Sequence, residues 1–100
     1  MNNIDLIKNG ARDMCLALGI DYYIGIKYQL GKDGFIHLNY ANDHFETALS
    51  IPSDRCPIHC ARQVVELCAE IEGRNKFHNK MIEFIKTTDI SLTFQFKEKS

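Results

Sequence analysis

Two thiols and one imidazole lie close together in this chain, in the stretch Cys56-Pro57-Ile58-His59-Cys60. Thiolate and imidazole are the usual protein ligands of zinc, and a thiol at the start of a helix is activated by the helix dipole. The stretch therefore predicts either a metal site or a reactive thiol built from Cys56, His59 and Cys60. No other stretch of the sequence suggests chemistry so directly.

The same stretch lacks much of what a metal or catalytic centre needs. Zinc takes four ligands, and the remaining imidazoles of the chain are His37, His44 and His78. Zinc modules usually supply two separated ligand pairs, and no second pair is visible here. Cys56 and His59 could meet across one helix turn, but no third group is placed to orient the imidazole. We therefore expect no enzymatic activity and no cofactor, and keep zinc at this cluster as an alternative.

The composition is typical of a globular protein, and the length predicts a single domain spanning 1–100. Its 12 basic and 13 acidic side chains give a net charge of −1, which argues against a strongly basic nucleic-acid binder. The N-terminus has no secretory signal, and the longest apolar run is far shorter than a membrane span. Cys15 and Cys68 fall inside amphipathic patterns as small apolar residues. These features predict a cytoplasmic protein with free cysteines and no membrane partner.

The spacing of apolar residues predicts the elements of the fold. A helix is expected over 3–18, where Gly10 indicates a kink or a close contact, and three alternating strands over 22–30, 35–40 and 44–51. A second helix starts near Asp54 with Pro57 in its first turn. Gly73-Arg74-Asn75 is expected to interrupt it before a short third helix or a bent continuation, and 90–97 alternates as a last strand. The prediction is an α+β two-layer sandwich of order α-β-β-β-α-α-β, with a four-stranded, mainly antiparallel sheet covered by helices on one face.

The polar face of this expected sheet is the second candidate site. If Tyr40 and Phe45 close the second hairpin, His37 lies opposite Ala48 and Asn39 opposite Glu46. Aromatic residues are enriched at protein interfaces, and edge strands invite pairing. The sequence thus predicts a protein-binding face, and a homodimer or heterocomplex, through Tyr23, Lys27, Phe35, His37, His44 and Glu46.

These observations favour a small protein–protein interaction module that acts as an adaptor, an inhibitor or a subunit. Compact inhibitors of this kind are common in phages and other mobile elements, so an accessory inhibitor is included in the expectation. The helix-strand-strand-strand-helix order is similar to that of the double-stranded-RNA-binding domain, an order match only. That domain relies on a basic start to its second helix, whereas here Arg55 is offset by Asp54. Nucleic-acid binding is therefore a further alternative, and we do not expect it.

Overall fold

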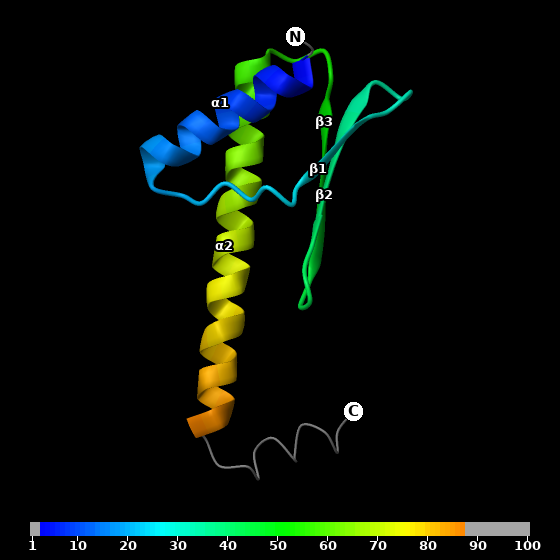
Figure 1. Ribbon diagram of the computed structural model, residues 1–100. Helices are drawn as coiled ribbons and strands as arrows, with labels where there is room; N and C mark the ends of the chain where they lie inside the picture. The colour runs from blue at the N-terminus through cyan, green and yellow to red at the C-terminus, as the bar shows by residue number, and fades with distance from the viewer. Residues whose placement is uncertain (1–2, 88–100) are drawn as a thin grey trace.

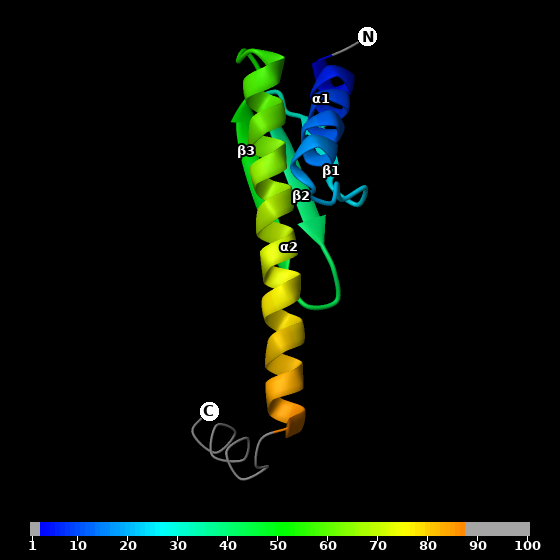
Figure 2. The ribbon, with the colours of Figure 1, turned by 90° about the vertical axis from the view of Figure 1, so that its left-hand side faces the viewer.

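The computed structural model describes residues 3–87, whose elements follow the order α-β-β-β-α (Figure 1). The elements are α1 Asn3–Leu18, β1 Lys27–Leu30, β2 Phe35–Ala41, β3 Glu46–Pro52 and α2 Pro57–Thr87. The strands form one antiparallel sheet in the order β1-β2-β3. Both helices lie on the same side of this sheet, and no described element covers its other face (Figure 2). The broad α+β class agrees with the prediction.

The core lies between the sheet and the two helices. α1 contributes Ile7, Ala11 and Cys15, and the sheet contributes Ile36, Leu38 and Ile51. The residues that α2 buries are Cys60, Ala61, Val64, Val65, Leu67, Cys68 and Ile71. The two helices approach closely at Gly10, where an added Cβ would lie 3.3 Å from the Cβ of Ala61. The close contact expected at Gly10 is confirmed.

The register of the second hairpin differs from the expected one by two residues. His37 pairs with Ser50 and Asn39 with Ala48, so the predicted partners were wrong. The difference arises at the turn, where the side-chain oxygen of Asn42 accepts the backbone N–H groups of His44 and Phe45. Because strand side chains alternate with a period of two, this shift leaves every residue on its expected face.

α2 is one continuous helix of 31 residues, so the predicted separation into two helices at 73–75 is wrong. A glycine inside a helix costs about 1 kcal/mol relative to alanine, which is too little to break a helix held on both sides. Two ion pairs bridge the glycine: Glu70 with Arg74 at 3.3 Å and Glu72 with Lys76 at 3.6 Å. These pairs explain why the helix continues.

The predicted four-stranded sheet is also wrong, because the described residues form a sheet of three strands. The segment expected to supply the fourth strand, 90–97, lies outside the described residues. β1 begins at Lys27 and not at residue 22. The preceding residues form a turn in which the N–H of Ile26 donates to the carbonyl of Tyr23, and Tyr22 and Tyr28 share a hydroxyl hydrogen bond of 2.7 Å.

The described part of the molecule is elongated because α2 is longer than the sheet. Its extents are 56 × 31 × 17 Å, and its radius of gyration of 17.6 Å exceeds the roughly 13 Å of a compact domain of 100 residues. Both ribbon views show the C-terminal end of α2 continuing past the β2–β3 turn without another described element beside it (Figures 1 and 2). The last buried residue of α2 is Ile71. We call 72–87 the projecting half.

Candidate protein-interaction site

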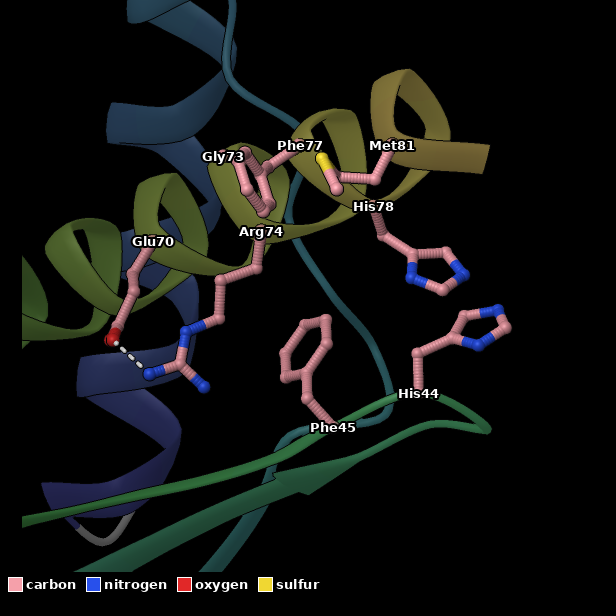
Figure 3. Close-up of a pocket in the computed structure, with 8 residues that line it drawn as sticks. All are labelled: His44, Phe45, Glu70, Gly73, Arg74, Phe77, His78 and Met81. Atoms are coloured by element: carbon pink, nitrogen blue, oxygen red, sulfur yellow. Dashed lines mark ion pairs between the residues drawn. The ribbon is translucent and has the colours of Figure 1, made fainter. Parts of the chain in front are cut away.

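A pocket of about 460 Å³ lies where α2 leaves the sheet (Figure 3). The β2–β3 turn contributes one wall and the middle of α2 the other. The lining residues are His44, Phe45, Glu70, Gly73, Arg74, Phe77, His78 and Met81. Since Phe45, Phe77 and Met81 present apolar surface and Gly73 carries no side chain, this junction pocket suits an apolar group of a partner.

Polar contacts hold the β2–β3 turn against α2 at one end of the pocket. The side-chain amide of Asn42 donates to the side-chain oxygen of Asn75 on α2 at 3.1 Å. The imidazoles of His44 and His78 stack, with ring centroids 3.7 Å apart. Nε2 of His78 is buried and has no hydrogen-bond partner among the described residues. The turn is therefore fixed to the helix, and the pocket is formed before any partner arrives.

An ion pair and a ring contact fix the middle of the pocket. Nη2 of Arg74 lies 3.3 Å from Oε1 of Glu70 on the preceding helix turn. The guanidinium also lies over the ring of Phe45, 5.3 Å from its centroid. Figure 3 shows the Arg74 side chain between Glu70 and Phe45. This contact joins Phe45, the residue before β3, to α2. The apolar side chains of Phe77 and Met81 line the pocket beyond it.

Past the pocket, α2 carries large apolar side chains that the described chain leaves exposed. They are Phe77, Met81, Ile82, Phe84 and Ile85, with exposed fractions from 36% to 65%. At about 100° per residue they share one side of the helix, whereas Lys76, Asn79, Lys80 and Glu83 share the other. We call these five apolar residues the α2 arc. Together with the junction pocket, the arc forms a continuous apolar strip on the projecting half.

The cysteine–histidine cluster is divided by the helix on which it lies. Cys60 is buried, with its Sγ near the carbonyls of Pro52 and Arg55, whereas Cys56 and His59 are exposed. Burial raises the pKa of the Cys60 thiol, which disfavours the thiolate that a metal or a nucleophile requires. Within residues 3–87, no group of three or more His, Cys, Asp or Glu side chains is arranged to hold a metal ion.

The six residues predicted to form a binding face are separated into three places. Lys27, Phe35, His37 and Glu46 alternate with inward-facing residues and lie on the open face of the sheet. Tyr23 precedes β1 and packs edge to face on Tyr40, with centroids 5.6 Å apart. His44 lies in the β2–β3 turn and stacks on α2 as described above. Strand alternation does not predict where Tyr23 and His44 lie, because neither of them is part of a strand.

Sequence reasoning missed a hydrogen-bonded line of Asp33, His37 and Ser50 on the open face. Nδ1 of His37 lies 2.8 Å from Oγ of Ser50, and Nε2 lies 2.9 Å from Oδ2 of Asp33. The backbone N–H of Phe35, followed by the contact with His37, lowers the pKa of Asp33. The exposed side chains of Asp33 and His37 leave this line in water, where an imidazole–hydroxyl pair activates a nucleophile poorly. We interpret it as a clamp between the first turn and β3.

Comparison of the chain with protein-family models, curated proteins and solved structures finds no match. The site is therefore interpreted from its own geometry. In the described part of the chain, neither helix is long and apolar enough to cross a membrane.

Proposed function

We propose that this protein is a non-enzymatic interaction module, an adaptor, inhibitor or subunit, that binds a protein partner through the α2 arc and the junction pocket. One observation carries the proposal: five large apolar side chains share one side of a helix that extends past its own sheet. Scattered exposed apolar residues are normal, but a contiguous apolar strip usually marks an interaction surface.

The energetics of the projecting half support this proposal. Isolated helices shorter than about 12–15 residues are marginal in water, and most helix stability in proteins comes from packing of an apolar face. The projecting half packs its apolar face against little of the described chain. A partner that covers Phe77, Met81 and Phe84 would supply that packing, in the mode in which a helix binds through residues three, four and seven apart.

The groups at the junction pocket favour contact over catalysis. Its lining contains two imidazoles, a guanidinium and a carboxylate but no hydroxyl or thiol that could act as a nucleophile. Arg74 is engaged by Glu70 and Phe45, which suits a wall of a binding site.

We further propose the open sheet face, with Lys27, Phe35, His37 and Glu46, as a second contact surface. The two edge strands β1 and β3 border it, and within residues 3–87 no further strand pairs with their outer edges, where a partner strand could add. We also propose a reducing, cytoplasmic location, supported by the free thiols of Cys15, Cys56, Cys60 and Cys68.

An affinity experiment in lysate of the native host tests the proposal. The immobilised full-length protein is compared with a Phe77→Ala, Phe84→Ala variant and with a Leu16→Ala, Leu18→Ala variant, which removes exposed apolar side chains of α1. We expect a protein, either a host protein or a second copy of this chain, to bind the first and third and to be at least tenfold depleted on the second. Binding that is equal on all three, or absent from all three, would contradict the proposal.

A further inference from the structure

We propose that the partner of the α2 arc is a second copy of this chain, and that two projecting halves pack antiparallel in a two-fold dimer. This inference rests on the proposed function and names the partner of the same surface. We call the line of residues along which the two helices would meet the seam. Its residues are spaced at alternating steps of four and three: Cys60, Val64, Leu67, Ile71, Arg74, His78, Met81 and Ile85. That repeat is the one by which helices pair in coiled coils. In this chain α1 and the sheet bury the first half of the line, and residues of the β2–β3 turn contact Arg74 and His78. Met81 and Ile85 remain exposed.

The strip on the projecting half is complementary to itself when reversed. At about 100° per residue, Arg74, His78, Met81 and Ile85 fall within a sector of roughly 60°. The junction pocket lies at the Arg74 end of this line, and Ile85 protrudes at the other end with 47% of its surface exposed. A two-fold axis between residues 79 and 80 places Ile85 of each copy at the pocket of the other.

The aromatic flank of the strip fits the same arrangement. Phe77 and Phe84 are one heptad apart and lie on the same flank of the line, with exposed fractions of 65% and 51%. In an antiparallel two-fold pair of helices, each flank meets the same flank of the other copy. Phe77 of one copy therefore comes near Phe84 of the other, two residues, or about 3 Å along the helix, from the level that the axis pairs with Phe77. Opposed aromatic rings are a favourable contact.

A parallel arrangement of the same two surfaces is disfavoured by charge and by the position of the sheet. It would place Arg74 beside Arg74 and would bring both sheets to the same end of the helix pair. At that end the β2–β3 turn already contacts α2 through the His44–His78 stack and the Asn42–Asn75 hydrogen bond. The antiparallel arrangement places the two sheets at opposite ends of the helix pair.

The available area is sufficient for a weak, specific dimer. If a fully exposed large apolar side chain presents about 200 Å², the exposed fractions of the α2 arc leave about 480 Å² per chain. Two copies would bury roughly 1,000 Å², which is at the lower limit for specific interfaces. We therefore expect a dissociation constant in the micromolar range, because interfaces of this size seldom bind more tightly without strong polar contacts.

Sedimentation velocity of the purified full-length protein from about 1 to 200 µM tests the association. The expected result is a shift from one to two chains across that range. Met81→Glu, which places a charge at the centre of the seam, should remain monomeric at 200 µM. Leu16→Glu, the same change at an exposed position of α1, should dimerise like the unaltered protein. Far-UV circular dichroism of both variants shows whether each is folded.

The direction of the helices is tested with a short bismaleimide cross-linker, in a Cys56→Ser background because Cys56 is the exposed native thiol. A mixture of Phe77→Cys and Phe84→Cys proteins should cross-link at least fivefold more than either alone. Cross-linking of each variant mainly with itself would indicate parallel helices and overturn the arrangement.

The remaining outcomes separate this inference from the proposed function. If the pure protein stays monomeric at 200 µM, or if Met81→Glu dimerises unchanged, self-association through the arc is overturned. The proposed function then stands only if a host protein binds the arc in the lysate experiment. A monomer in which the Phe84→Cys thiol is protected from maleimide would indicate that residues 88–100 of the same chain cover the arc, which also overturns the dimer.

Discussion

The two halves of α2 share a repeat of positions but differ in residue type and in surroundings. The second half has Arg74 and His78 at the repeat positions before Met81 and Ile85. In the first half, Cys60, Val64, Leu67 and Ile71 are almost completely buried against α1 and the sheet. In the projecting half, Met81 and Ile85 continue that spacing and remain 41% and 47% exposed. The point at which packing ends is therefore set by the length of the strands and not by the pattern of the helix. The exposed apolar residues beyond Ile71 are the observation on which the proposed interaction site rests.

The largest expected effect compares two isoleucines of α2, Ile71 and Ile85. Ile71→Ala should lower the free energy of unfolding by about 2–5 kcal/mol, because the side chain is fully buried and its removal leaves a cavity. Ile85→Ala should lower it by less than about 1 kcal/mol at 1 µM protein, because little of its surface is covered within one chain. Urea denaturation measures both.

Protein concentration sharpens this first comparison. At 200 µM the cost of Ile85→Ala should increase, since association then stabilises the unaltered protein. The cost of Ile71→Ala should change little with concentration. Equal costs at 1 µM would show that the two halves are packed alike and would remove the basis of the comparison.

The second prediction uses the two helical glycines, Gly10 and Gly73. Gly10→Val should destabilise by about 1–3 kcal/mol, since the helix–helix contact with Ala61 leaves no room for a branched side chain. Gly73→Ala should stabilise by about 1 kcal/mol, because nothing lies within 4 Å of the added Cβ and alanine favours the helix. Thermal unfolding measures both, and a destabilising Gly73→Ala would show that the junction is packed more tightly than the first half.

The sequence predicted the parts of the fold that depend on local spacing. α1, the three-strand meander and a second helix with Pro57 in its first turn follow from periodicity, propensity and capping, although β1 starts at Lys27 and α2 starts at Pro57 and not near Asp54. At Gly10, where a kink or a close contact was expected, the structure has the close contact. The predicted break at 73–75 failed because ion pairs across Gly73 compensate for its low propensity. The predicted register of the second hairpin was wrong because hydrogen bonds from the backbone to the Asn42 side chain fix the turn at another position.

The candidate site was less predictable than the fold, for a physical reason. The Phe45, Phe77 and Met81 side chains were visible as apolar residues of their own elements, but their pocket depends on where the second hairpin ends along α2. Likewise, the exposure of Ile85 depends on the length of the sheet. Periodicity identifies the side of a helix that will be covered, whereas only the three-dimensional arrangement shows how far the cover extends.

The third prediction concerns the thiol of Cys15, which lies in the packed region. Burial, and secondarily the neighbouring Cys68, raises its pKa from 9.0 to about 11. A raised pKa means that the folded state keeps the proton that the unfolded chain releases, so this stabilisation is complete below pH 9 and is lost as the pH rises towards 11. The melting temperature should fall over this range, and Cys15→Ala should fall less steeply than the unaltered protein.

Cys56 provides the control for this experiment, because it is exposed and contacts little of the core. Cys56→Ala should keep the full alkaline decrease. If Cys15→Ala and Cys56→Ala show the same slope from pH 9 to 11, the titration of the buried thiol does not contribute to stability.

The smallest expected effect compares two arginines on α2 that each pair with a glutamate four residues away. Arg74 lies 3.3 Å from Glu70, is half-exposed and covers the ring of Phe45, so Arg74→Ala should cost about 1 kcal/mol at 1 µM protein. Arg62 lies 3.8 Å from Glu66 in full solvent, so Arg62→Ala should cost at most about 0.5 kcal/mol. Urea denaturation in low and high salt separates the contributions: salt should weaken the Arg62 effect but leave part of the Arg74 effect, which comes from contact with an aromatic face. Equal, fully screened effects would show that the guanidinium of Arg74 does not hold the pocket wall and that the pocket is less fixed than its contacts indicate.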